Sequence, residues 1–373
     1  MALVLNEDEK MLRDTAEGFM ADKAPVKALR TLRDTADADG IDRALWQEMA
    51  AMGFAGVVIS EDHGGVDMGY MAAGLIAEQM GRNLTASPFL SSAVLAATAL
   101  SKAGSDTQKS QWLPKIASGQ TLMALAVDEG RKHNPGNIDM SAERSGNGFK
   151  LSGSKAMVVD GHIADQIIVA ANTAEGVTLF LVDAKSKGLA VNRTDMIDSH
   201  NAARLEFDDV AVNADAVIGD VGGGMNALNA ALNAGRAVIG AELVGASHQA
   251  FKDTVEYIRE RKQFGTEIGR FQALQHRASH LYSEIEIARS AMLAALTALD
   301  ADAPDAEMTV AMAKAKIGSV AKLASQEGVQ MHGGVGMTDE YDIGLYMKRI
   351  RVLQELFGDA AYHMEQIAKS RGF

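Results

Sequence analysis

Apolar residues recur every three or four positions over most of the first 120 residues, which is the spacing of helices with one buried face. Asn6 and Glu9 have the spacing of a capping box at the start of the first helix. The apolar stripe that follows comprises Leu12, Ala16, Phe19 and Met20. Further helices are predicted over residues 42–54, which Gly53 closes, and over residues 69–82 and 87–104.

The pattern changes near residue 121, where short apolar or alternating runs are separated by Gly, Asn and Asp. Such runs are typical of β-strands that are joined by turns. They span residues 122–129, 148–159, 165–171, 177–183 and 203–212. We therefore expect a small antiparallel barrel or sandwich in the middle of the chain.

Helical spacing returns from about Gly222 and continues to the end of the chain. One helix face carries Met225, Leu228, Leu232, Gly235, Ile239 and Leu243. Two more long helices are predicted over residues 268–299 and 309–333, and four long helices in this region favour a bundle. The predicted fold is thus mainly α with a β domain: an N-terminal helical domain (1–120), a central small β-barrel (121–218) and a C-terminal four-helix bundle (219–373).

Composition narrows the possible functions. The chain has 373 residues, a net charge of −13 and no cysteine. The absence of cysteine excludes disulfides, thiolate nucleophiles and Cys-based metal sites. The acidic balance argues against binding to nucleic acid or to an anionic membrane. The N-terminus does not resemble a signal peptide and no apolar run is long enough to span a bilayer, so we expect a cytoplasmic protein.

The scattered histidines do not indicate a metal site. They lack a carboxylate at ligand spacing and are expected to be surface or cap residues. The four in question are His133, His162, His200 and His332. The glycine run at residues 222–224 follows no clear strand of a βαβ unit, so we interpret it as the hinge between the β domain and the bundle.

Two segments carry the candidate chemistry. The first, residues 259–279, places a basic cluster at the end of one helix and Phe and Gln side chains at the start of the next. The second, residues 330–340, reads QMHGGVGMTDE. Taken singly, the first is equally compatible with a helix–loop–helix corner that has solvated basic residues. The second is equally compatible with a helix C-cap and a glycine turn.

Together the two segments resemble the motifs of the acyl-CoA dehydrogenase family. The first family motif, Arg-x-x-Phe-Gly-x-x-Ile-Gly-x-x-Gln, is met by Arg261, Phe264, Gly265, Ile268, Gly269 and Gln272. The second, Gln-x-x-Gly-Gly-x-Gly, is met by Gln330, Gly333, Gly334 and Gly336. The order of helices, β domain and bundle resembles the family over nearly the whole chain.

The resemblance implies that these residues bind FAD held by a neighbouring subunit. Arg261 would pair with the pyrophosphate, and Gly333 and Gly334 would let the main chain approach it without a Cβ clash. Phe264 would pack near the adenosine half. The full set of candidate cofactor-binding residues is Arg261, Gln263, Phe264, Phe271, Gln272, Gln330, Gly333 and Gly334.

The catalytic carboxylate of the family is missing at both of its usual places. Family members remove a proton from the acyl Cα with a carboxylate while the flavin takes a hydride from Cβ. Phe357 occupies one place of that base and Gly235, which precedes Arg236, occupies the other. Three nearby acids are candidates for a displaced base, although each is also compatible with a solvated or capping role: Glu355, Asp359 and Glu242.

The family's flavin-ring motifs are also altered. The loop that cradles the ring in the family corresponds to residues 126–139, which lack the family sequence. The family's Trp-Ile-Thr strand is replaced by residues 157–159, Met-Val-Val, or a near register. The parts that would serve this chain's own flavin ring are therefore changed, while the parts that would serve a neighbour's nucleotide tail are kept.

Three interpretations stay open. The chain resembles the small subunit of pimeloyl-CoA dehydrogenase and the base-lacking subunits of steroid side-chain dehydrogenases, which implies a heterotetramer with a second acyl-CoA dehydrogenase subunit. It could instead be a self-sufficient homo-oligomer with a displaced base, or a scaffold that binds acyl-CoA or FAD without chemistry. The resemblance further implies an acyl-CoA substrate from fatty acid or steroid side-chain β-oxidation, with electron-transfer flavoprotein as acceptor.

Overall fold

The computed structural model describes residues 4–373, which divide into two compact units. The helical unit contains the chain up to Thr31, residues 70–85 and residues 236–373. The mixed unit contains residues 32–69 and 86–235. The N-terminal helices are consequently shared between the two units, and α7 (Met225–Glu260) contributes to both.

The sheet of the mixed unit has the strand order β6-β7-β3-β2-β4-β5-β8, with β1 beside β4. The strands are β1 (Met123–Ala126), β2 (Ser141–Ser145), β3 (Gly148–Val159), β4 (Gln166–Thr173), β5 (Gly176–Asp183), β6 (Leu189–Asp195), β7 (Asn201–Asn213) and β8 (Val217–Ile218). The predicted β domain in the middle of the chain is confirmed. Within residues 4–373 no pairing joins β6 to β8, so the strands form an open path.

Two pairings, β1–β4 and β2–β4, are parallel, whereas we expected antiparallel strands throughout. The reason is the long connection over residues 127–165, which contains the β2–β3 hairpin and returns the chain in its original direction. The strands β2 and β6 were not predicted from the sequence. Both are mostly exposed and polar, so they lack the apolar alternation that identifies a half-buried strand.

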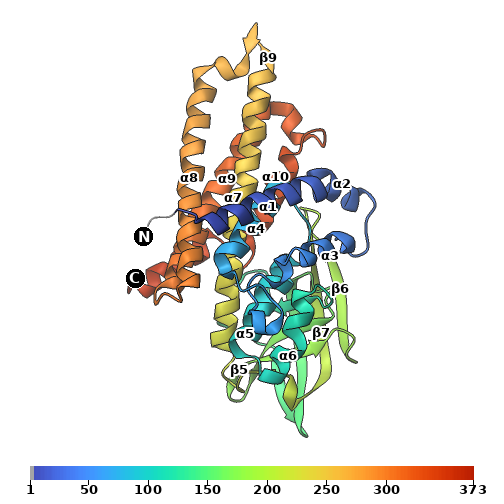
Figure 1. The fold of residues 1–373 in the computed structure, drawn as a ribbon. Coiled ribbons are helices and arrows are strands. Elements are labelled where there is room, and N and C mark those ends of the chain that lie inside the picture. Colours follow the sequence, from blue (N-terminus) through green and yellow to red (C-terminus); the bar gives the residue numbers. More distant parts are fainter. Residues whose placement is uncertain (1–3) are drawn as a thin grey trace. The chain divides into compact units, whose positions relative to one another are not determined.

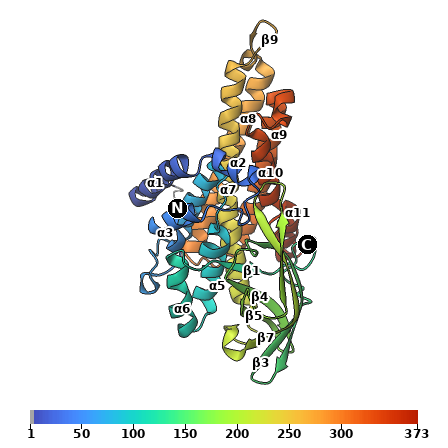
Figure 2. The same cartoon turned by 90° about the vertical axis from the view of Figure 1, so that its right-hand side faces the viewer.

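Helices pack beside this sheet within the mixed unit. They are α3 (Arg43–Ala51), α5 (Ala97–Ala103), α6 (Asp106–Ala117) and the π-helical segment η3 (Phe89–Ala96) that leads into α5. The large buried side chains Trp46, Phe89 and Phe180 lie in the core. The predicted helix over residues 87–104 is therefore present but begins with π-helical geometry. Figure 1 and Figure 2 both show α5 and α6 beside the strands.

The helical unit is built around three long helices that run alongside one another (Figure 1). These are the later part of α7, α8 (Gln272–Asp300) and α9 (Ala306–His332). The other helices are α1 (Glu7–Lys23), which has the predicted Asn6–Glu9 capping box, α2 (Val26–Asp34), α4 (Gly69–Asn83), α10 (Ile343–Glu355) and α11 (Ala360–Ser370). The fourth long helix of the predicted bundle is interrupted between α10 and α11.

Two glycines allow α4 and α7 to approach each other closely. A Cβ at Gly81 would meet the carbonyl group of Glu242, and one at Gly245 would meet the carbonyl group of Glu78. Any side chain at either position would push the two helices apart. This contact holds the middle of α7 in the helical unit, and the C-terminal end of α7 leads into the first of the two sequence motifs.

Candidate functional site

The first motif forms a short β-hairpin between α7 and α8. Its strands are β9 (Lys262–Gln263) and β10 (Thr266–Glu267), and its turn residues Phe264 and Gly265 have φ values of +55° and +82°. Two positive φ values in a two-residue turn are typical of a tight hairpin. The Phe264 side chain is 90% exposed, and its ring meets Phe271 edge-on with 6.2 Å between centroids. The hairpin thus presents an aromatic ring to solvent.

Arg261 is the cation of this hairpin that is available to an anion. Its main chain is fixed, because its N–H donates to the Tyr257 carbonyl and its carbonyl accepts from Ile268, both at 2.8 Å. Within residues 4–373 its guanidinium forms no ion pair. Two other basic residues share Glu267, Arg270 at 2.7 Å and Lys262 at 3.7 Å.

The second motif continues from the end of α9. Gly333 has a φ value of +66°, and a Cβ added at Gly333 or Gly334 would meet no atom within 4 Å in the described part of the chain. Gly336 differs, since a Cβ there would lie 2.9 Å from the His332 side chain. Gly333 and Gly334 therefore leave main chain accessible from the outside, whereas Gly336 is a packing position. Gln330 is exposed one turn before them.

An aromatic cluster connects the two motifs. The ring of Tyr257, one turn before Arg261, stacks on His332 with 4.4 Å between centroids and 20° between planes. Tyr341 meets both rings at 5.5 Å. His332 directly precedes Gly333, so this stack fixes the end of α7 against the end of α9. Tyr257 and Tyr341 were not predicted from the sequence, because neither belongs to a motif and the stack joins residues far apart in the chain.

His332 stands at the cap position before the 3-10 turn η6 (Gly333–Met337), as expected, but it is not a surface residue. Its side chain is buried, its Nδ1 donates to the Gly328 carbonyl at 2.7 Å, and burial lowers its pKa. The expectation of a surface or cap residue is wrong for His200, which is also buried. Both histidines are held by local hydrogen bonds to carbonyl oxygens, which makes burial possible without a metal. The residues that the structure describes contain no group of three or more His, Asp or Glu that could hold a metal ion.

The start of α8 completes this end of the helical unit. Gln272 is the first residue of α8 and is exposed, while Gln275 donates to the Gly269 carbonyl at 3.0 Å. An ion pair of 2.6 Å between Arg277 and Glu327 joins the first turns of α8 to the last turns of α9. The structure therefore brings the eight predicted cofactor residues to the ends of three neighbouring helices. The hairpin, labelled β9 in Figure 1, projects beyond them.

The position expected to carry a catalytic acid lies at the break between α10 and α11. Phe357 has a φ value of +55° and Gly358 one of +104°. The Phe357 ring is buried, and its carbonyl accepts a hydrogen bond from Arg236 Nε at 3.0 Å. A buried hydrocarbon ring can neither accept nor donate a proton. Gly235 also supplies no side chain that could do so.

Each of the three candidate replacement acids has a partner. Glu242 forms a buried ion pair with Arg349 at 2.7 Å. Glu355 pairs with Arg351 at 2.9 Å on the surface. The third acid, Asp359, caps α11 by accepting from the Tyr362 N–H at 2.7 Å. These contacts give every candidate an ordinary structural role.

The acidic side chains of the loop between β1 and β2 are bound by neighbouring groups of the mixed unit. Lys155 is fully buried, and its Nζ donates to the Val127 carbonyl at 3.0 Å and to Glu129 at 2.6 Å. Burial lowers the pKa of Lys155, and the Glu129 carboxylate opposes that shift. Glu129 also accepts from two main-chain N–H groups, and Asp128 binds His133 Nδ1 at 2.9 Å. This loop is therefore held by Lys155 of β3 and by hydrogen bonds among its own residues.

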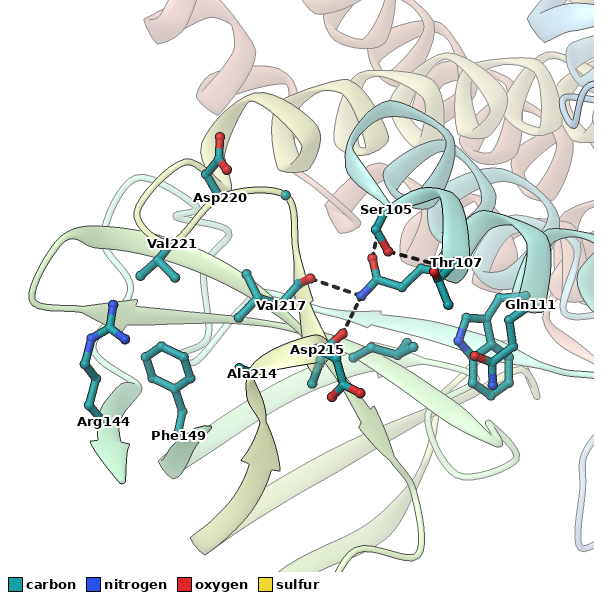
Figure 3. A pocket seen from close by; sticks show the side chains of 15 residues that line it. Ser105, Thr107, Gln111, Arg144, Phe149, Ala214, Asp215, Val217, Asp220 and Val221 are labelled. Atoms are coloured by element: carbon teal, nitrogen blue, oxygen red, sulfur yellow. Dashed lines mark hydrogen bonds between the residues drawn. The ribbon is translucent and has the colours of Figure 1, made fainter. Parts of the chain in front are cut away.

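A cavity of about 660 Å³ lies in the mixed unit between α6 and the sheet (Figure 3). Arg144, which contacts Glu175 at 3.0 Å and the face of Phe149 at 5.1 Å, lines one side. Gln108 donates to the carbonyls of Asp215 and Val217 at 2.9 and 3.0 Å. The cavity contains none of the predicted cofactor residues, so it is separate from the candidate site.

Comparison with known proteins gives consistent matches along the chain. Residues 6–120 match "Acyl-CoA dehydrogenase, N-terminal domain", residues 124–210 the middle domain and residues 222–371 the C-terminal domain. Acyl-CoA dehydrogenase FadE12 of Mycobacterium tuberculosis is 30% identical over 319 residues, which cover 83% of this chain and 82% of that protein. No helix within residues 4–373 has the length and apolarity to cross a membrane.

Two solved structures are similar over almost the full length. One is a variant of the Tcur3481-Tcur3483 steroid ACAD, with a TM-score of 0.90, 28% identity and 98% coverage of both chains. The other is the ChsE4-ChsE5 complex from Mycobacterium tuberculosis, with a TM-score of 0.90, 25% identity and coverage of 100% of this chain and 99% of that one. Both matches extend across the two units described above.

Proposed function

Because the chain belongs to the acyl-CoA dehydrogenase family, we propose that it is one subunit of a heteromeric, FAD-dependent acyl-CoA dehydrogenase and completes the cofactor site of its partner chain. The chain is thereby an oxidoreductase of this family. The observation that carries the proposal is the buried Phe357 at the helix break, where a proton acceptor would be needed.

The end of the helical unit fits the nucleotide tail of FAD. Among residues 4–373 Arg261 has no ion-pair partner, so it offers a cation for a diphosphate, and a charge-assisted contact of this kind contributes about 1.5–3 kcal/mol. Gly333 and Gly334 leave open main chain beside it. Phe264 gives the adenosine half an aromatic surface, which accounts for a ring that is otherwise exposed to water. Bound FAD supplies the acceptor for the hydride that leaves the acyl chain.

Removal of the proton from the acyl Cα is assigned to a base of the partner chain. In this chain Glu242, Glu355 and Asp359 are all engaged, so a displaced base would have to leave an ion pair or a helix cap. The altered loop over residues 126–139 is closed by Lys155 and its neighbours, which supports a seat for the flavin ring in the partner. The names of two similar structures each pair two chains, which is consistent with this division.

The substrate proposed for the complex is an acyl-CoA thioester, from a fatty acid or a steroid side chain. Electron-transfer flavoprotein is the proposed acceptor. The chain's own contribution is to bind the diphosphate and adenosine of the partner's cofactor. The competing function is that of a homo-oligomer with a displaced base. It requires that Glu242, Glu355 or Asp359 is essential for turnover.

The direct test is to purify the chain alone and together with a second chain of the acyl-CoA dehydrogenase family that co-purifies with it. We expect the chain alone to have little flavin and no turnover of acyl-CoA, because it lacks the base and the ring cradle. The pair should be yellow and active. Stoichiometric flavin and turnover in the chain by itself would overturn the proposal in favour of the homo-oligomer, and a flavin-free, inactive pair would favour a scaffold.

A further inference from the structure

The break between α10 and α11 leaves several carbonyl groups without helical N–H partners. A helix ends with about four such carbonyls, and buried ones need another donor. Here α10 stops at Glu355, and the chain turns through two residues with positive φ before Asp359 caps α11. Left-handed geometry at a bulky residue such as Phe357 is strained and persists only where surrounding contacts impose it.

Lys314, in the middle of α9, supplies the missing donors. Its Nζ lies 3.0 Å from the Leu353 carbonyl, 3.1 Å from the Gln354 carbonyl and 3.1 Å from the Gly358 carbonyl. The first two carbonyls belong to the last turn of α10, and the third lies beyond the break. The side chain is buried. One ammonium with three N–H donors thus joins the two sides of the break.

Other charged and titratable groups face the same place. Arg236 on α7 donates to the Phe357 carbonyl, and its guanidinium lies over the Tyr362 ring. Glu355 at the end of α10 and Asp359 at the start of α11 face Lys314 electrostatically. His363 on α11 lies beside Gly358. Arg236 is therefore the second cation at the break, and His363 is the other ionisable side chain whose contribution has to be separated from that of Lys314.

We propose that Lys314 is a positioning residue, which fixes the α10–α11 break and through it the location of the side chain at position 357. The inference goes beyond the proposed function, because it holds whether or not residue 357 takes part in chemistry. Lys314 touches no reacting atom in this assignment. It acts by tying the last carbonyls of α10 to the carbonyl of Gly358.

The protonation of Lys314 makes this role measurable. Burial lowers its pKa to about 7, and Arg236 adds to the shift, while Glu355 and Asp359 oppose it. An ammonium has three N–H donors and a neutral amine has two, so deprotonation leaves one of the three carbonyls without its donor. The break should therefore loosen as pH rises through neutral.

The folding stability of the chain, in contrast to the order at the break, should increase as pH rises through neutral. The sign of this change follows from proton linkage. Below about pH 7 the folded and unfolded chains both hold the Lys314 proton. Between that pH and the ordinary value of 10.5, the unfolded chain holds more protons, so this group raises folding stability as pH rises. Lys314→Met removes the group, so the melting temperature of wild type relative to this variant should rise with pH across that window.

The experiment uses the full chain labelled with fluorophenylalanine. The 19F resonance of Phe357 is the one lost in Phe357→Leu, among eleven phenylalanines. We expect this resonance to titrate with a midpoint near neutral pH in wild type and in His363→Gln, and to be independent of pH in Lys314→Met. Lys316→Met is the matched control, since Lys316 lies two residues away on α9 and pairs with Glu284 on α8.

Four results would overturn the inference. They are a Phe357 resonance that does not shift between acid and alkaline pH, a titration that survives in Lys314→Met, one that disappears in His363→Gln, and one that Lys316→Met abolishes equally. If Lys314→Met does not fold, the wild-type and His363→Gln titrations decide alone. If the Phe357 resonance titrates with the same midpoint near neutral pH in wild type and in His363→Gln, the inference is supported. If either protein lacks this titration, the inference is contradicted.

Discussion

At the scale of single residues, the acids around position 357 are explained by their partners. Glu242 and Arg349 neutralise each other inside the helical unit, and removing one member of a buried pair leaves an uncompensated charge. Glu355 and Arg351 form an exposed pair, which contributes little to stability. Asp359 satisfies one N–H at the start of α11. These roles predict stability effects of different sizes and no direct effect on chemistry.

Replacing the three acids in turn tests that ranking. Glu242→Gln should destabilise most, by about 3 kcal/mol, because Arg349 stays buried without its counter-charge. Asp359→Ala should cost about 1 kcal/mol, and Glu355→Gln less than about 1 kcal/mol. Urea unfolding of the full chain measures these changes. Turnover of each folded variant with its partner chain should be retained, and a loss of about 100-fold or more in one of them would identify that acid as the base.

At the scale of elements, the cofactor motifs depend on how α7 meets α9. Tyr257 stacks on His332, and these residues immediately precede the regions that carry Arg261 and Gly333. Neither ring belongs to the predicted cofactor contacts. The stack should therefore influence cofactor binding only through the relative placement of the two helix ends.

Tyr257→Leu should accordingly weaken flavin binding by the complex, by about tenfold, while the variant remains folded. The reason is that the hairpin and the glycine turn lose their common support. Flavin titration of the apo-complex measures the change. Tyr282→Leu is the control, because it removes a comparable ring contact with Phe251 elsewhere in the helical unit. Equal losses in the two variants would mean that general destabilisation, rather than placement, is responsible.

The periodic elements could be predicted from the sequence, and the irregular ones could not. The apolar stripes of α1 and α7 and the alternating runs of β3 and β7 identify their elements without tertiary information. The exposed strands β2 and β6 carry no such signal. The break at Phe357 is held by contacts with two distant residues, Lys314 and Arg236. Local pattern does not contain those contacts.

At the scale of the whole molecule, some candidate site residues could be predicted from the sequence and others could not. Arg261, Phe264 and Gly333 could be selected from the sequence because motif spacing identifies them, and the structure places their helix ends together. Tyr257 and Lys314, which support these and the helix break, belong to no motif. Their roles follow from pairs of residues far apart in the chain, so only the folded structure identifies them.

The whole chain also shows why the proposed oxidation needs a second chain. Within residues 4–373, the end of the helical unit that is proposed to bind FAD displays a cation without an ion-pair partner, an exposed ring and open glycine main chain. Phe357, which under the proposal occupies the place of the proton acceptor, is a buried hydrocarbon ring. Under the proposed function, a chain that binds the nucleotide tail of FAD but has no proton acceptor contributes to oxidation of an acyl thioester only with another chain. That other chain supplies the acid and the seat of the flavin ring.

The most direct test of this account measures the flavin affinity of the paired chains after Arg261→Gln in this chain only. Losing a charge-assisted contact of about 1.5–3 kcal/mol should weaken binding by roughly 10–100-fold. Arg259→Gln, which changes an exposed arginine two residues earlier, should leave the affinity unchanged. An unaltered affinity in Arg261→Gln, or an equal loss in both variants, would contradict the claim that this chain binds the nucleotide tail of its partner's cofactor.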